Sequence, residues 1–144
     1  MNGLEIEIQH PINDQHQFSL NYTLMNGQET NQNRITTTDT ITYPYLLKRP
    51  KHSLNAQWNY TINKKWSSAV TGRFISERKD VGGYASPDVT LGYYTLLNAS
   101  VQYNWSKRVT VFANGQNLLN DQFSEIYGYN AIGRMLQFGI RLQF

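Results

Sequence analysis

Apolar and polar residues alternate with a period of two from one end of the chain to the other. Successive side chains of a β-strand point to opposite faces, so this period predicts strands with one apolar and one polar face. Apolar spacing at i, i+3 and i+4 is not sustained anywhere, and no helix is required. We therefore expect an all-β, antiparallel fold with about seven strands, at residues 4–9, 17–24, 53–62, 66–74, 93–104, 109–116 and 136–144.

The last expected strand shows the alternation most clearly. Its polar face carries Gln137, Gly139, Arg141 and Gln143. Its apolar face carries Leu136, Phe138, Ile140, Leu142 and Phe144. The expected strand before it has one exception, because Phe112 interrupts its polar face.

The connections between these strands alternate strictly between short and long. Short turns are expected near 11–14, 63–65 and 105–108, and long surface loops at 26–51, 77–92 and 119–133. Bacterial outer-membrane barrels have tight turns on the periplasmic side and longer loops outside. A soluble meander has no reason to sort its connections in this way.

Strand length and aromatic placement also favour a membrane. Several expected strands run for ten or more residues, near the roughly 9 to 11 that cross a bilayer at a tilt and above the roughly 5 to 6 usual in soluble proteins. Rings on the apolar face collect at strand ends, as in the two aromatic girdles of membrane barrels. Tyr60, Trp66, Tyr103, Trp105 and Phe144 lie beside short turns, and Phe74 and Tyr93 lie towards long loops.

The expected structure is thus a transmembrane β-barrel segment. An unpaired strand edge in hydrocarbon leaves backbone groups unsatisfied, so an odd number of strands should belong to a larger barrel. The alternatives are a passive porin-like barrel and a soluble β-sandwich binding module, because a soluble sheet also has one apolar and one polar face.

Composition narrows the function further. Charged residues make up 16% of the chain, and the net charge of +3 comes from scattered Lys and Arg. The main basic cluster, at Lys48, Arg49 and Lys51, is interpreted as a solvated loop, so no nucleic-acid partner is expected. The lack of Cys excludes disulfides, thiolate metal sites and a cysteine nucleophile. The first residues lack the features of a signal peptide, so either a signal was removed or the chain is a fragment.

No catalytic site, metal site or cofactor is expected. Glu5 and Glu7 share one strand face and are interpreted as lumen contacts rather than a glycosidase pair. The three His residues have no metal-ligand spacing. The acids of the long loops, Asp39, Asp80 and Asp88, are interpreted as solvated.

The last thirty residues resemble the C-terminal end of TonB-dependent outer-membrane receptors. The resemblance rests on the stretch 117–123, which ends the penultimate strand and contains Asn117, Leu118 and Asn120, on the stretch 125–130, and on Gly133-Arg134 before the last strand. Leu119 stands where Phe is commoner in that family. Residues 45–54 and the Ile-Tyr-Gly-Tyr stretch at 126–129 are similar to the cobalamin-receptor branch.

This resemblance implies that residues 1–144 are the C-terminal portion of a barrel of about 22 strands, with the plug domain absent. The full protein is then a receptor of the Gram-negative outer membrane that takes up a bulky nutrient such as cobalamin or a ferric siderophore. The implied partners are outer-membrane lipid, the remaining strands and plug, and the TonB complex through the missing N-terminal part. The barrel-assembly machinery is expected to recognise Gln137, Gly139, Ile140, Leu142 and Phe144.

Ligand contacts, if the receptor hypothesis holds, should come from aromatic and amide side chains of the long loops, where rings offer rigid contact area. The alternative for each is packing within the loops or girdles. The candidates are Tyr43, Tyr45, Tyr84, Tyr127, Tyr129 and Asn130.

Overall fold

The computed structural model describes residues 1–33, 36, 38–81 and 87–144. These residues form β-strands joined by turns and loops. No helix of the described ranges is long and apolar enough to cross a membrane. The strands are β1 (Asn2–Pro11), β2 (His16–Asn26), β3 (Glu29–Gln32), β4 (Thr40–Tyr43), β5 (His52–Thr61), β6 (Trp66–Ile75), β7 (Arg78–Asp80), β8 (Val89–Leu91), β9 (Tyr94–Asn104), β10 (Val109–Gln116) and β11 (Met135–Leu142).

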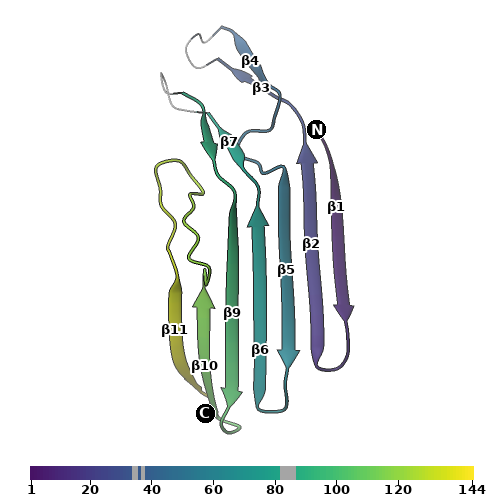
Figure 1. The fold of residues 1–144 in the computed structure, drawn as a ribbon, viewed down its shortest axis with the longest axis vertical. Coiled ribbons are helices and arrows are strands. Elements are labelled where there is room, and N and C mark those ends of the chain that lie inside the picture. Colours follow the sequence, from purple (N-terminus) through teal and green to yellow (C-terminus); the bar gives the residue numbers. More distant parts are fainter. Residues whose placement is uncertain (34–35, 37, 82–86) are drawn as a thin grey trace.

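Seven of these strands form one antiparallel sheet, in the order β1-β2-β5-β6-β9-β10-β11. Figure 1 shows them side by side, with the tight turns at one end and the long connections at the other. The predicted seven-stranded antiparallel sheet is therefore confirmed. We call 27–51 the first connection, 76–93 the second and 117–134 the third.

Two of the long connections are more regular than the sequence indicated. The first contains the hairpin β3–β4 and the second contains the hairpin β7–β8, each a two-stranded sheet of its own. The sequence predicted surface loops here and did not predict the two hairpins. Their strands are only three or four residues long, so alternations such as Thr-Ile-Thr-Tyr in β4 and Val-Thr-Leu in β8 are too short to distinguish a strand from a loop.

The register of the sheet keeps the apolar and polar residues on separate faces. Residues paired across an antiparallel ladder share a face. Val70 pairs with Trp58 and Ala99, whereas the next residue, Thr71, pairs with Gln57 and Asn98. The two faces inferred from the alternation are those of the sheet.

Phe112, the exception on the polar face, has a specific place in the structure. It pairs with Gly139, and a Cβ atom added to Gly139 would lie 2.4 Å from Phe112 Cζ. The guanidinium of Arg141 lies 5.9 Å from the centre of the Phe112 ring. The glycine thus leaves room for the ring, which contacts the cation at an attractive distance.

The outer strands differ slightly from their predicted limits. β1 continues through Pro11, which was expected in the turn, and β11 ends at Leu142 rather than at Phe144. Pro11 is the last residue of β1, so its missing N–H removes no hydrogen bond from the middle of the ladder.

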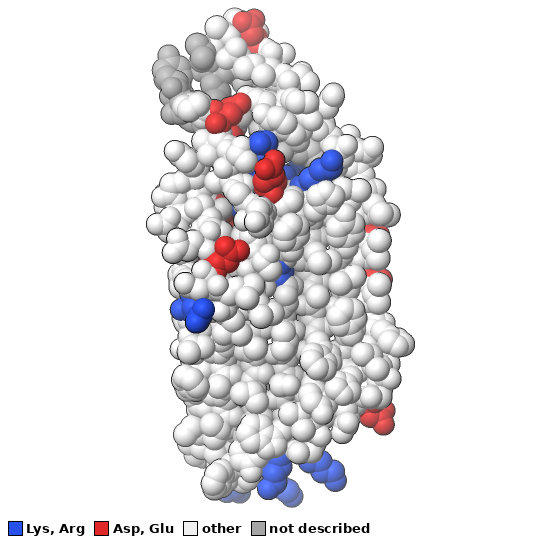
Figure 2. Space-filling model, in the orientation of Figure 1, with Lys and Arg blue, Asp and Glu red and all other residues white. Residues whose placement is uncertain are grey.

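The seven-stranded sheet is a single layer, and no second layer covers it within the described residues. Large apolar side chains of the apolar face are exposed, including Trp58 (43%), Ile140 (66%) and Phe138 (76%). The buried apolar residues are Leu47, Ile75, Leu91 and Tyr94, which lie in or beside the first two connections. Figure 2 shows that charged side chains collect towards the two ends, while most of the strand surface in view is free of them.

Aromatic rings contact one another at both ends of the strands. Trp66 and Tyr103 lie 4.5 Å apart between ring centroids, and Trp105 meets Tyr103 edge-on at 6.2 Å. Phe74 and Tyr93 lie 6.3 Å apart at the other end. The placement expected for two girdles is therefore present in the structure.

Candidate functional site

The three long connections lie at one end of the sheet, which we call the loop end (Figure 1). The short strand β7 belongs to the second connection, and its three residues contact both the first and the third connection. Lys79 and Asp80 contact the first connection, and Arg78 contacts the third.

The contact with the first connection is mostly through the backbone. Lys48 N donates to Lys79 O at 2.7 Å, and Lys48 Nζ lies 3.6 Å from Asp80 Oδ1. Leu47, beside it, is buried and donates its N–H to Glu29 Oε2 at 3.0 Å. This hydrogen bond and a second one from Asn31 lower the pKa of Glu29 below its ordinary value. The hairpin β3–β4 is thereby tied to β7.

The contact with the third connection joins two buried side chains, Arg78 and Tyr94, to the exposed carboxylate of Glu125. Arg78 is only 5% exposed; its Nη1 donates to Glu125 Oε2 at 2.5 Å, and its Nη2 to Ser124 O at 2.9 Å. The hydroxyl of the fully buried Tyr94 also donates to Glu125. The Tyr94 ring stacks on Phe123 at 4.1 Å and lies 5.4 Å from the guanidinium of Arg78.

The charge of Glu125 is favoured by this arrangement. Partial burial raises the pKa of the carboxyl group, but the hydrogen bonds from Tyr94 and Arg78 and the charges of Arg78 and Arg73 lower it by more. The pKa of Glu125 therefore lies below its ordinary value. At neutral pH the carboxylate is ionised and holds the third connection against β7 and β9.

Asn117 organises the beginning of the third connection. It is 5% exposed and has a φ of 47°, in the left-handed region that Asn tolerates better than most residues. Its side chain donates to Asp121 O at 2.9 Å and accepts from Asp121 N at 3.0 Å, while its backbone N–H donates to Asn98 Oδ1. Asp121 in turn accepts from Thr95 N at 2.8 Å. These hydrogen bonds give partners to polar groups of β9 that lie beyond the residues paired with β10.

The other residues of the family motif close the same connection. Asn120, with a φ of 55°, accepts from Arg134 N at 2.9 Å. A Cβ at Gly133 would lie 3.0 Å from Asn120 Oδ1, so the chain passes close to this amide. Leu118 packs over Gly115, where an added Cβ would lie 2.6 Å from Leu118 Cδ2. The motif therefore joins both ends of the third connection.

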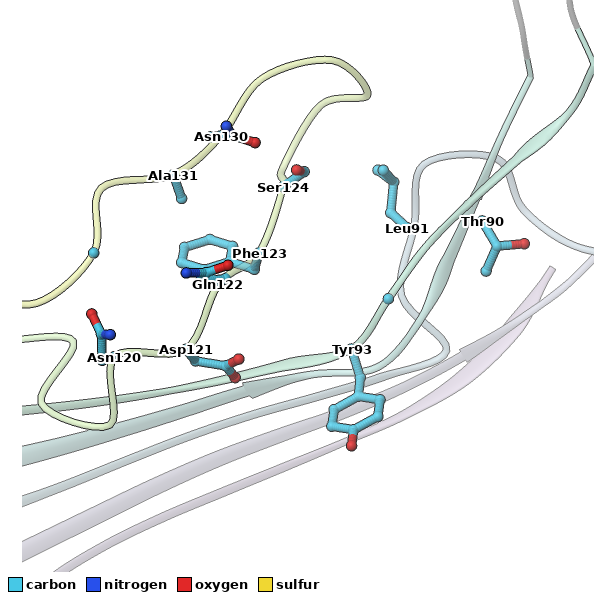
Figure 3. Close-up of a pocket in the computed structure, with 12 residues that line it drawn as sticks. Thr90, Leu91, Tyr93, Asn120, Asp121, Gln122, Phe123, Ser124, Asn130 and Ala131 are labelled. Carbon is cyan, nitrogen blue, oxygen red and sulfur yellow. The ribbon is translucent and has the colours of Figure 1, made fainter.

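A cavity of about 490 Å³ lies between this connection and the β8–β9 junction (Figure 3). Asn120, Gln122, Phe123, Ser124 and Asn130 line it from one side, and residues 90–93 from the other. The Tyr93 ring points away from the third connection. Amides, two hydroxyls, the Asp121 carboxylate and the Phe123 ring form a surface suited to hydrogen bonding a large polar ligand while packing against its apolar part.

A second cavity, of about 360 Å³, lies between the first connection and the ends of β2, β5 and β6. Tyr45, Arg49, Lys51 and Lys79 line it together with Glu77. Its surplus of cations favours a ligand with anionic groups.

The structure places some of the predicted ligand residues at these cavities and others elsewhere. Asn130 lines the first and Tyr45 the second. Tyr43 packs on Tyr45, with 5.7 Å between ring centroids. Tyr127 and Tyr129 are 64% and 71% exposed and line neither cavity. Tyr84 lies outside the described residues.

Several residues of the first cavity were not proposed as ligand contacts from the sequence. Gln122 and Phe123 belong to the stretch 117–123 that carries the family resemblance, but neither they nor Ser124 show a pattern that would mark them as ligand contacts. The described residues contain no group of three or more His, Asp or Glu side chains that could hold a metal ion.

Comparison with known proteins gives a family and several relatives. A family model described as "TonB dependent receptor-like, beta-barrel" matches residues 1–118. The match covers the first six strands of the main sheet and ends at Leu118, so Asn120, Gly133 and Arg134 lie beyond it. The vitamin B12 transporter BtuB of Vibrio cholerae is 28% identical over 104 residues, which are 69% of this chain and 16% of BtuB.

Solved receptors have the same fold. The closed form of the ferric-catecholate import receptor Fiu from Escherichia coli K12 superposes with a TM-score of 0.78 at 18% identity, over 99% of this chain and 20% of Fiu. The siderophore receptor PiuA from Acinetobacter baumannii gives 0.74 at 17% identity, over 97% of this chain and 21% of PiuA. The chain thus spans about a fifth or less of the proteins that it resembles.

Proposed function

We propose that this chain, which belongs to the TonB-dependent receptor-like β-barrel family, forms the C-terminal portion of the barrel of an outer-membrane nutrient receptor. The observation that carries the proposal is the single-layered sheet with one exposed apolar face. In a bilayer, lipid covers that face and water or a plug domain meets the other. The Gram-negative outer membrane is accordingly the proposed location.

The proposed ligand is a bulky, scarce nutrient. The relatives are named as a vitamin B12 transporter, a ferric-catecholate import receptor and a siderophore receptor. Cobalamin is the first candidate because the BtuB similarity is one of sequence, and a ferric siderophore is the second. Both are large molecules with many polar groups, which the amides of the first cavity and the cations of the second suit.

The proposed partners follow from the family and from the open sheet. Among the described residues β1 and β11 each pair with one strand, so the remaining barrel strands are proposed to complete both edges. We also propose that a part of the receptor outside these residues supplies a plug domain and contacts the TonB complex. The barrel-assembly machinery is proposed to recognise β11 and the residues after it through Gln137, Gly139, Ile140, Leu142 and Phe144.

Ligand binding and uptake test the proposal directly. The protein purified from outer membranes in detergent should bind cyanocobalamin or a ferric catecholate siderophore, measured by equilibrium dialysis. The double variant Tyr45→Ala/Asn130→Ala should bind about tenfold more weakly, or ~1.4 kcal/mol. Asn104→Ala, at the opposite end of the sheet, is the matched control and should bind normally.

Energy dependence separates the proposal from its alternatives. Cells should accumulate the bound nutrient only when TonB is present. Flux of small solutes without TonB would instead indicate a passive porin-like barrel. A cooperative, monomeric fold in buffer without detergent would indicate a soluble β-sandwich.

A further inference from the structure

A group of cations lies at the end of the sheet opposite the ligand cavities. Lys64 and Lys65 lie in the turn between β5 and β6, and Lys107 and Arg108 lie in the turn between β9 and β10. Arg141 lies near the end of β11. Figure 2 shows Lys and Arg side chains collected at this end of the molecule.

The two turns and the last strand lie side by side. Asn104 N donates to Lys65 O at 2.8 Å, and Gln143 N donates to Arg108 O at 2.9 Å. A cavity of about 550 Å³ lies among them, which we call the basic cavity. Lys64, Lys65, Lys107 and Arg141 line it, together with Trp105.

The cations of the basic cavity have no acidic counterpart there. The ion pairs among the described residues join Lys48, Arg78 and Lys79 to acids at the loop end. No Asp or Glu of the described part of the chain lines the basic cavity. Like charges held close together repel one another. Binding of an anionic partner relieves this repulsion and is favoured by attraction to all four cations.

The position of the basic cavity within the sheet shows which kind of anion can reach it. Asn104, Thr110 and Arg141 form one row of paired residues on the polar face, and all three line the cavity. Membrane lipid meets the opposite, apolar face. The cavity therefore opens towards the lumen side of the sheet, where a protein segment rather than a lipid headgroup is the available anion.

We propose that the basic cavity binds an acidic peptide segment at the tight-turn end of the lumen. Carboxylates of the segment pair with Lys64, Lys65, Lys107 and Arg141. Contact with the Phe112 ring restrains the Arg141 guanidinium, which leaves its N–H groups available to a carboxylate. This proposal does not depend on the identity of the nutrient.

Binding of a charged peptide tests the inference. The protein, extracted from outer membranes in a neutral detergent, is titrated into fluorescently labelled hexaglutamate at low ionic strength, with hexalysine as the opposite-charge probe. Only hexaglutamate should bind, and its binding should weaken as salt is added. The variant Lys64→Gln/Lys65→Gln/Lys107→Gln should bind about tenfold more weakly, on the scale of three exposed ion pairs.

The controls separate the basic cavity from the general charge of the protein. The variant Lys48→Gln/Arg73→Gln/Arg134→Gln loses the same charge away from the tight-turn end and from the lining of both ligand cavities, and should bind hexaglutamate as the unmodified protein does. The smaller variant Lys64→Gln/Lys65→Gln changes one exposed turn and gives a readout if the triple variant does not fold. Equal loss in both triple variants, or no loss in the turn variants, overturns the proposal. Displacement of hexaglutamate by phosphatidylglycerol added to the micelles would assign the cavity to a lipid headgroup and also overturn it.

Discussion

In the strand region the large apolar side chains are exposed, whereas at the loop end apolar side chains are buried together with polar ones. Trp58 and Phe138 have no protein covering them among the described residues, while Tyr94 is completely buried beside Arg78 and Glu125. The strand region therefore depends on lipid for its apolar contacts. The loop end is held together by contacts within the chain.

Because of this difference, the two regions place different requirements on their residues. The strand region needs only the correct face towards lipid, and many apolar residues satisfy that need. The loop end needs particular donors and acceptors, because a buried polar group without a partner costs about 1 to 3 kcal/mol. Substitutions should therefore depend on the face of the sheet in one region and on individual hydrogen bonds in the other.

The largest effect is expected where a charge is placed on the apolar face. Val70→Arg, in the middle of β6, should lower the free energy of unfolding in a bilayer by roughly 2 to 4 kcal/mol, because the guanidinium meets hydrocarbon. Urea titration of the protein in lipid vesicles measures the change. Ala69→Arg, on the neighbouring position of the polar face between Asn59 and Ser100, should cost much less. The reverse order would exchange the inner and outer faces.

A smaller cost is expected from one methyl group on the polar face. Gly139→Ala places a Cβ atom 2.4 Å from Phe112 Cζ, so the ring must move, at a cost of roughly 1 to 3 kcal/mol. The same titration should show that Phe112→Leu recovers part of this loss in the double variant. Gly72→Ala is the matched control, since nothing lies within 4 Å of its added Cβ. Equal costs at the two glycines would contradict the role given to Phe112.

The two regions also differ in how far the sequence predicts them. Period-two alternation was enough to predict the seven strands and their faces, because a residue such as Val70 or Thr71 needs only the correct side of the sheet. Phe112 was visible as an exception, but its contact with Gly139 needs the register between β10 and β11. Alternation cannot supply that register when the connecting segment is long.

The loop end could be predicted only where a family motif marked it. Asn117, Asn120, Gly133 and Arg134 were singled out by resemblance, and the structure adds the hydrogen bonds that they make. The contact of Arg78 with Glu125 joins residues 47 positions apart in sequence, and no sequence pattern marks Arg78 as the partner of Glu125. Such a contact depends on how three connections pack, which local patterns do not encode.

A local effect is expected when the organising asparagine is replaced. Asn117→Ala removes the side-chain hydrogen bonds to Asp121 and should destabilise the third connection by about 2 kcal/mol while leaving the strands intact. Hydrogen exchange of residues 117–134 against that of β5 and β6 measures the difference. Asn117→Gly removes the strain at φ 47° but not the loss of bonds, so it should recover only part of the stability. Asn130→Ala in the same connection should have little effect.

The smallest effect is a dependence on pH at the loop end alone. The pKa of Glu125 is lower in the folded protein than its ordinary value near 4.5, so its contribution to stability is present above that value and is lost as the pH falls through the folded pKa. Hydrogen exchange of the third connection should therefore become faster as the pH falls below this ordinary value, relative to the same residues at pH 7 and after correction for the intrinsic rate. Glu125→Gln should make this connection less protected at pH 7 and remove its acid dependence. An unchanged acid dependence in Glu125→Gln would assign the titration to another carboxyl group. A loss of strand protection in the same pH range would show that the two regions do not unfold separately.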